Sequence, residues 1–219
     1  MPDMRSRRPV PGTARMPALA LLLALLLPAA AQGAEPLRDW PCREPLVAPL
    51  TAAMVWPDGR PPVRAPLPPE RAWEADPRIR ALVEFAANPE NPPAAGGEAI
   101  ARFAAEPGGN RPETLGLVLS GVVDLTNRLR AIMVDGIGLN VARSALLAEV
   151  VNTDAAALEA ADTPPERRTE IRQARFWNLR HLDKAEDDAG MICRRIAYSE
   201  RKLRALAQAI AEAAATAPD

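Results

Sequence analysis

The chain has 219 residues and a formal net charge of −1, with 48% hydrophobic and 4% aromatic residues. This length allows one domain of ordinary size. The near-neutral charge gives no reason to expect nucleic acid or an anionic membrane as a partner. Of the 24 prolines, 21 lie at or before Pro112, so the second half of the chain is free to form long helices.

The first 34 residues have the pattern of a secretory signal peptide. Four arginines among the first 15 residues precede an apolar run from Ala18 to Leu27, and small residues follow. The run is too short to cross a bilayer. We expect residues 1–34 to be removed, with cleavage between Ala31 and Ala34, which leaves no membrane span. The pattern predicts a periplasmic or secreted protein.

Residues 35–76 form an irregular segment that is rich in proline and tryptophan. The prolines prevent long regular elements there. A disordered linker would be poor in residues such as Trp40, Trp56 and Trp73. We therefore expect an ordered strap, anchored by its tryptophans to a helical body.

Two short helices are predicted within residues 77–109. The first begins at Asp76-Pro77, an N-cap followed by a proline in the first turn. The second runs from about Gly97 to Ala105. Apolar residues at helical spacing form their inward faces: Ile79, Leu82, Val83 and Ala86 in the first, and Ile100, Phe103 and Ala104 in the second.

Two long helices are predicted over residues 110–162 and 163–216. Each begins with a capping-box pattern, Asn110 with Glu113 and Thr163 with Glu166. Each then carries an apolar series in steps of three and four, which is typical of a coiled-coil seam. The first series is Leu115, Val118, Val122, Leu125, Leu129, Ile132, Gly136, Leu139, Arg143, Leu146 and Val150, and the second is Leu182, Ala185, Ala189, Ile192, Ile196, Ser199, Leu203, Leu206, Ile210 and Ala213.

These elements predict an all-α fold, in which a long antiparallel coiled-coil hairpin carries the two short helices and the strap, with residues 35–219 as one domain. A turn centred on residues 162–165 places Gly136 and Gly138 opposite Ala189 and Gly190. We expect the first arm to continue through Gly136-Ile137-Gly138, at most with a kink. The alternative is a break into two helices, because each glycine costs about 1 kcal/mol relative to alanine.

The two cysteines, Cys42 and Cys193, are separated by almost the whole exported chain. An exported protein with two cysteines favours an intramolecular disulfide. It would fasten the strap to the edge of the second arm, beside Ile192. An interchain bridge and a redox pair remain alternatives, although the Cys-x-x-Cys spacing of catalytic dithiols is missing. We expect reduction to loosen residues 35–74 and to leave the hairpin helical.

The strap and hairpin carry an ordered set of features: Trp40-Pro41-Cys42, Val47, Pro49, Leu50 and Val55-Trp56, followed by an Asp-Pro helix and a long hairpin. In these features the chain resembles an uncharacterised group of proteobacterial secreted proteins. The resemblance implies architecture and compartment but no activity.

The sequence lacks the residues of familiar catalytic or cofactor sites, so we expect no enzyme activity and no cofactor. His181 is the only histidine, which leaves serine nucleophiles and zinc sites without partners. Acidic residues at Asp135, Asp183 and Asp187 are weak candidates for a calcium or magnesium site. Nearby basic residues make ordinary helix ion pairs the preferred interpretation.

The remaining candidates are apolar surfaces. Phe176-Trp177 lies across from Val150 and Val151 in the predicted register, either as packing at the hairpin tip, which we favour, or as an exposed partner-binding patch. Leftover apolar residues on the first arm would allow a homodimer unless the strap and short helices cover them: Leu119, Val123, Met133 and Ile137.

The sequence therefore favours a non-catalytic periplasmic or secreted protein. It would act as a binding, scaffold or assembly factor, and its partner would be another envelope protein or a second copy. The alternative is a ligand- or cation-binding helical-bundle domain.

Overall fold

The computed structural model describes residues 40–46, 49–59, 71–109 and 111–216. The chain divides into two units, Met1–Glu35 and Pro36–Asp219, and every described residue belongs to the second. The predicted signal segment therefore lies outside the described residues, as does Asn110 of the first predicted capping box.

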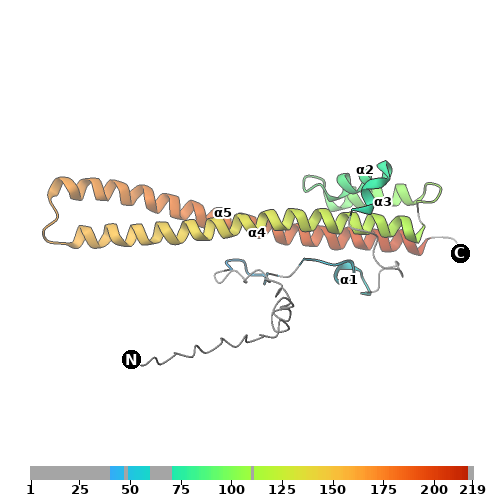
Figure 1. Cartoon of the computed structure of the whole chain (residues 1–219), viewed down its shortest axis with the longest axis horizontal. Coiled ribbons are helices and arrows are strands. Elements are labelled where there is room, and N and C mark those ends of the chain that lie inside the picture. The colour runs from blue at the N-terminus through green and yellow to red at the C-terminus, as the bar shows by residue number, and fades with distance from the viewer. Residues whose placement is uncertain (1–39, 47–48, 60–70, 110, 217–219) are drawn as a thin grey trace, which may run out of the picture. The chain divides into compact units, whose positions relative to one another are not determined.

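Two long antiparallel helices dominate the second unit (Figure 1). Helix α4 covers Pro112–Glu159 and helix α5 covers Pro165–Ala215, and the two pack side by side. At 1.5 Å per residue, the two helices are about 72 and 77 Å long. The first arm runs unbroken through Gly136 and Gly138. The predicted all-α hairpin is confirmed, and α4 is one continuous helix.

The turn between the arms is closed by side chains rather than by the predicted capping box. Thr163 is not the N-cap of α5. That position is Pro164, which makes no side-chain cap. The Thr163 hydroxyl instead donates to the carbonyl of Ala157 at 2.7 Å. The Arg168 guanidinium donates to the carbonyls of Thr163 and Ala160, at 2.9 and 2.8 Å. These contacts satisfy carbonyl groups that the end of α4 would otherwise leave free.

The two short helices pack on the half of the hairpin that is remote from this turn. Helix α2 covers Pro77–Ala87 and begins, as predicted, with the Asp76 carboxylate accepting from the amide of Arg78. Helix α3 covers Pro93–Ala104, four residues longer at its start than predicted, because Pro93 suits the first helical position. All seven predicted inward residues of the two helices are buried.

Gly96 lets α3 approach α5 closely. A Cβ atom at this position would lie 2.7 Å from Leu206 Cδ2 and 3.3 Å from the carbonyl oxygen of Ala86. The absence of a side chain therefore brings three helices into contact in the main core.

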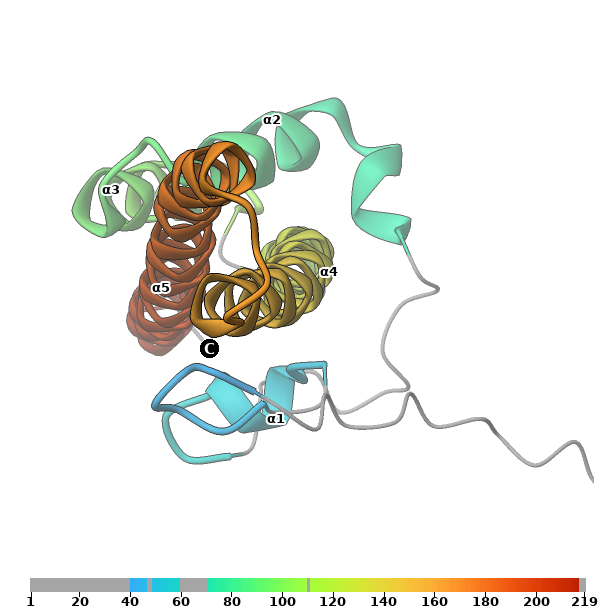
Figure 2. The same ribbon diagram turned by 90° about the vertical axis from the view of Figure 1, so that its left-hand side faces the viewer.

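The strap is ordered where the structure describes it: its first part, around α1, lies across α4–α5 from the short helices, whereas its end lies beside α2 (Figure 2). It contains helix α1, Ala52–Val55, and the 3₁₀ turn η1, Ala72–Ala75. The side-chain amide of Asn127 pairs with both backbone groups of Leu50, at 2.9 and 2.8 Å. The indole of Trp73 is buried and donates to Asp124 of α4 at 3.1 Å. Tryptophan and asparagine contacts thus fasten the strap to α4, independently of any disulfide.

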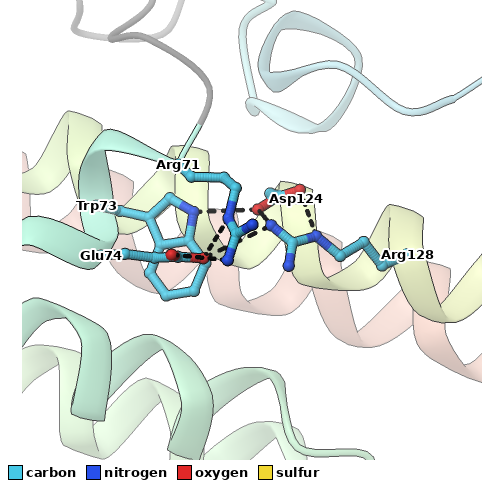
Figure 3. Close-up of polar contacts among 5 residues, drawn as sticks. All are labelled: Arg71, Trp73, Glu74, Asp124 and Arg128. Carbon is cyan, nitrogen blue, oxygen red and sulfur yellow. Dashed lines mark hydrogen bonds and ion pairs between the residues drawn. The ribbon is translucent and has the colours of Figure 1, made fainter.

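A small charged network surrounds the Trp73 anchor (Figure 3). Arg71 donates twice to the carboxylate of Glu74, at 2.7 and 2.8 Å, and Arg128 bridges Asp124 and Glu74. The hydrogen bonds from Arg71 are the main reason that the pKa of Glu74 lies below its ordinary value. This network orients η1 at the point where the chain enters α2.

The seam of the first arm differs from the prediction beyond Val122. The predicted row is buried at Leu115, Val118 and Val122 and is then exposed at Ile132, Leu139, Leu146 and Val150. The second predicted seam is confirmed, with most of its members buried. Helix α4 is apolar on more than one side, and the side that is buried carries these residues: Leu119, Val123, Thr126, Arg130, Met133, Ile137 and Val151.

The predicted alignment of the two arms is close to the observed one. Arg130 Nε lies 2.9 Å from Glu200 Oε1. A Cβ on Gly136 would lie 3.4 Å from Ile192 Cδ1. Both contacts fall within one helical turn of the predicted partners.

Candidate functional site

The predicted disulfide is present. Cys42 and Cys193 are bonded, with their Cα atoms 5.4 Å apart and a sequence separation of 151. The bridge borders a small apolar cluster formed by Met133, Ile137 and Ile196, against which Trp40 also packs. The Trp40 indole donates to the carbonyl of Glu44 at 2.7 Å, which closes the loop around Cys42. The disulfide therefore clasps the strap over the middle of the hairpin.

The four leftover apolar residues of the first arm are covered within the chain, which is the alternative to a homodimer surface that the sequence left open. Met133 and Ile137 are buried under the strap and α5, and Leu119 and Val123 belong to the main core. Residues buried within one chain cannot form an interface with another. These residues are covered by α5 together with the strap and the short helices.

The aromatic pair near the hairpin tip is exposed. Phe176 and Trp177 are 54% and 55% exposed, and their rings meet edge-to-face with centroids 5.2 Å apart. The favoured interpretation, that the pair packs at the tip, is therefore wrong, because about half of each residue is exposed. Val150 is exposed as well, whereas Val151 is buried in the hairpin and is unable to contribute to a partner surface.

We call the large exposed apolar residues of the two arms toward the tip the distal apolar face: Leu139, Leu146 and Val150 on α4, and Met191 and Trp177 on α5. On α4, Leu139 and Leu146 lie one heptad apart, and Val150 is one turn further. On α5, Met191 and Trp177 are two heptads apart, and the ion-paired Lys184 occupies the heptad position between them. The two rows start from Ile132 and Tyr198, which line the same groove. Since heptad spacing keeps a row on one side of a helix pair, both rows face the same way toward the tip.

Helix α4 is unusually apolar for its degree of burial. It contains an 18-residue window with mean hydropathy 1.4, of which 11% is buried, and it is long and apolar enough to cross a membrane by length and composition alone. The antiparallel packing of α5 along α4 accounts for only one side of this helix. Besides its buried residues, α4 therefore carries four large apolar side chains that the described chain leaves exposed: Ile132, Leu139, Leu146 and Val150.

The candidate metal ligands do not assemble. In the part of the chain that the structure describes, no three histidine, cysteine or acidic side chains gather as a metal site. Asp135 and the pair Asp183 and Asp187 are exposed. Lys184 pairs with Asp188 at 2.8 Å, an ordinary contact between residues four apart on a helix. His181 is exposed on α5.

A groove that the sequence did not reveal lies where the α2–α3 loop crosses the hairpin. Its volume is about 450 Å³. Its apolar wall includes Leu129, Ile132, Met133 and Leu206, and its polar lining includes Arg195, Tyr198 and Lys202. The groove adjoins the distal apolar face, because Ile132 and Tyr198, from which the two apolar rows start, belong to its lining.

Lys202 is the least expected residue of the groove. Its residue surface is only 4% exposed, and burial lowers the pKa of its ammonium group. Nζ donates to the carbonyl of Asn91 at 2.7 Å and to that of Asn88 at the end of α2. The sequence could have indicated the burial of Lys202. It lies three residues after Ser199 and four before Leu206, a spacing that places all three on the buried side of α5.

No family model, no curated protein and no solved structure matches the chain. The resemblance to a group of proteobacterial secreted proteins therefore stays a prediction.

Proposed function

We propose that this protein is a non-catalytic binding or assembly factor of the bacterial envelope, and that its distal apolar face binds an amphipathic helix of another envelope protein. The observation that carries the proposal is the exposure of Leu139, Leu146 and Trp177 on one side of the hairpin. Clusters of large exposed apolar side chains on soluble proteins often mark sites of interaction with another protein.

The chain itself supports a helix as the occupant. Leu125 and Leu129 belong to the same row of α4 as Leu139 and Leu146, and they line a hollow with Glu84 and Ala87 of α2. Helix α2 thus covers the proximal part of a row whose distal part no described element covers. A partner helix would continue this packing toward the tip, with apolar residues at helical spacing meeting the row.

The location in the envelope is part of the proposal. The Cys42–Cys193 disulfide is compatible with an oxidising compartment. The signal-peptide pattern of residues 1–34 adds a route of export to the periplasm or beyond.

Photocrosslinking in intact cells tests the proposal. A photoreactive phenylalanine analogue replaces Leu146, and the matched control carries it at Met54, an exposed apolar residue of the strap. We expect a product from position 146 whose partner peptide maps to an amphipathic helix, and none from position 54. The product should disappear when Leu139→Glu is added, or when Phe176 and Trp177 are both replaced by alanine.

Three outcomes would overturn the proposal. The first is the absence of a product that is specific to position 146. The second is a product that survives these substitutions. The third is a crosslink to a second copy of this chain, which would make the face a self-association surface instead.

A further inference from the structure

We infer that the groove beneath the α2–α3 loop binds a single-chain amphiphile with an anionic headgroup, the headgroup near Lys202 and the acyl chain against the apolar wall. This site adjoins the distal apolar face at Ile132 and Tyr198, and the inference does not depend on the proposed docking of a partner helix. The inference rests on the size of the groove, on its two cations and on the division of its lining into a polar and an apolar part.

The groove has the size of a small-molecule site. Its volume of about 450 Å³ falls within the range of about 300–1,000 Å³ that is usual for such sites. It lies between α4 and α5 on one side and the α2–α3 loop on the other, so three segments far apart in sequence enclose it. Leu129, Ile132 and Met133 make one wall apolar along α4, as an acyl chain requires.

The charge of the groove favours an anion. Lys202 and Arg195 supply two cations, and Glu90 is the one carboxylate of the lining. Neither cation has an ion pair with a carboxylate of the described residues. A buried ammonium held only by neutral carbonyls is costly, and an anion beside it would offset the lost hydration.

The remaining polar group of the lining fits the same headgroup. The Tyr198 hydroxyl makes no hydrogen bond to another residue that the structure describes, and it lines the groove with Arg195 three residues earlier on α5. The hydroxyls of Ser199 and Thr126 already donate to the carbonyls of Ile196 and Val122, so they are not spare donors. Lys202, Arg195 and Tyr198 are therefore the donors for a carboxylate or a phosphate.

Calorimetric titration of the purified, disulfide-bonded protein tests the inference. The probes are dodecanoate and dodecyl phosphate, with dodecyl maltoside as a neutral probe of the same chain length, all below the concentrations at which they form micelles. We expect one anionic molecule per chain, bound at least tenfold more tightly than the neutral probe. The anion that binds with the higher affinity identifies the preferred headgroup, carboxylate or phosphate. Equal binding of charged and neutral probes, or no heat with either anion, would overturn the site.

Two matched substitutions locate the site. Ile132 and Leu139 lie one heptad apart on α4 and are 70% and 74% exposed, but only Ile132 lines the groove. Ile132→Glu should weaken dodecanoate binding at least tenfold, and Leu139→Glu should leave it unchanged while removing the photocrosslink. Equal effects of the two substitutions on dodecanoate binding would contradict the assignment.

Two further substitutions test the headgroup contacts. Lys202→Met should abolish the preference for the anionic probes. Because this change also removes the hydrogen bonds to the α2–α3 loop, Arg195→Gln on the exposed rim provides a second variant, with an expected threefold to tenfold loss of affinity for the anions. Unchanged anion preference in both variants would also overturn the inference.

Discussion

Arg130 on α4 and Glu200 on α5 form an ion pair across the hairpin, with Nε 2.9 Å from Oε1 and with both side chains largely buried. The pair lies beside the disulfide, where Trp40, Cys42 and Cys193 line the same small hollow. It ties the register of the two arms to the place where the strap is clasped.

Replacing one member of this pair should lower the free energy of unfolding more than replacing both members. Arg130→Met leaves the Glu200 carboxylate buried without its main partner, and we expect a loss of about 3–5 kcal/mol in the free energy of unfolding. The double variant Arg130→Met, Glu200→Leu should recover most of this loss, because no uncompensated charge remains. Urea unfolding followed by circular dichroism measures both. A double variant as unstable as the single one would show that the pair is not an isolated unit.

The disulfide should stabilise the protein without holding the hairpin together. Replacing Cys42 and Cys193 by serine removes a cross-link that closes a loop of 151 residues, worth up to about 5 kcal/mol in the chain-entropy model. The Asn127 hydrogen bonds to Leu50 and the Trp73 anchor do not depend on it. The structure thus narrows the segment that we expect to loosen, from residues 35–74 to the part around residues 40–46.

Hydrogen exchange distinguishes these segments. In the serine variant, amides of residues 40–46 should exchange faster, and those of α4, α5 and residues 50–55 should keep their protection. The helical circular dichroism signal should not change. Loss of helical signal on removal of the bridge would mean that the disulfide supports the hairpin itself.

Substitution by alanine should have opposite effects on stability at two glycines of α4. A Cβ at Gly121 would lie 2.7 and 2.8 Å from the methyl carbons of Val83 and 3.0 Å from the Trp73 ring. Gly121→Ala should therefore destabilise the protein by about 1–3 kcal/mol through overpacking. At Gly136 the nearest atom is Ile192 Cδ1 at 3.4 Å. There, alanine should stabilise the helix by up to about 1 kcal/mol. Thermal unfolding of the two variants measures these changes in stability. A Gly121→Ala variant more stable than the parent chain would contradict the packing of η1 and α2 on α4.

Acid should weaken the network around η1. The folded-state pKa of Glu74 is lowered, mainly by hydrogen bonds from Arg71. Its contribution to stability is therefore present above the ordinary pKa of 4.5 and is lost as the pH falls through the folded-state pKa. Glu74→Gln should be less stable than the parent chain near neutral pH, and the two should converge in acid. Urea unfolding between about pH 3 and pH 7 measures the difference. A difference that is independent of pH would show that the carboxylate charge plays no part.

The sequence predicted the structure best where a pattern allowed only one arrangement. Asp76-Pro77 and the spacing of Ile79, Leu82, Val83 and Ala86 located α2 and its buried face, because a helix that is apolar on one side has one way to pack. The second arm was predictable for the same reason. The two cysteines had no competing partners in the sequence.

The first arm was ambiguous because it carries two apolar rows. Periodicity showed that Leu125, Leu129, Ile132 and Leu139 form a row but not which row meets α5. The observed interface includes Thr126 and the ion-paired Arg130, which no hydrophobicity argument selects. The groove was hidden for a related reason, since the burial of Lys202 depends on an α2–α3 loop that lies 111 residues away along the chain.

The proposed function requires the distal apolar face to be covered by a partner helix in the cell. Hydroxyl-radical footprinting tests it directly, by comparing the purified protein with the protein in its native envelope. Met191 of the face and Met54 of the strap are an internal pair of the same residue type, 41% and 52% exposed. Both should be oxidised readily in the purified protein. In the envelope, Met191 and Trp177 should be protected severalfold while Met54 is not. Equal oxidation of Met191 and Met54 in both settings would contradict the claim.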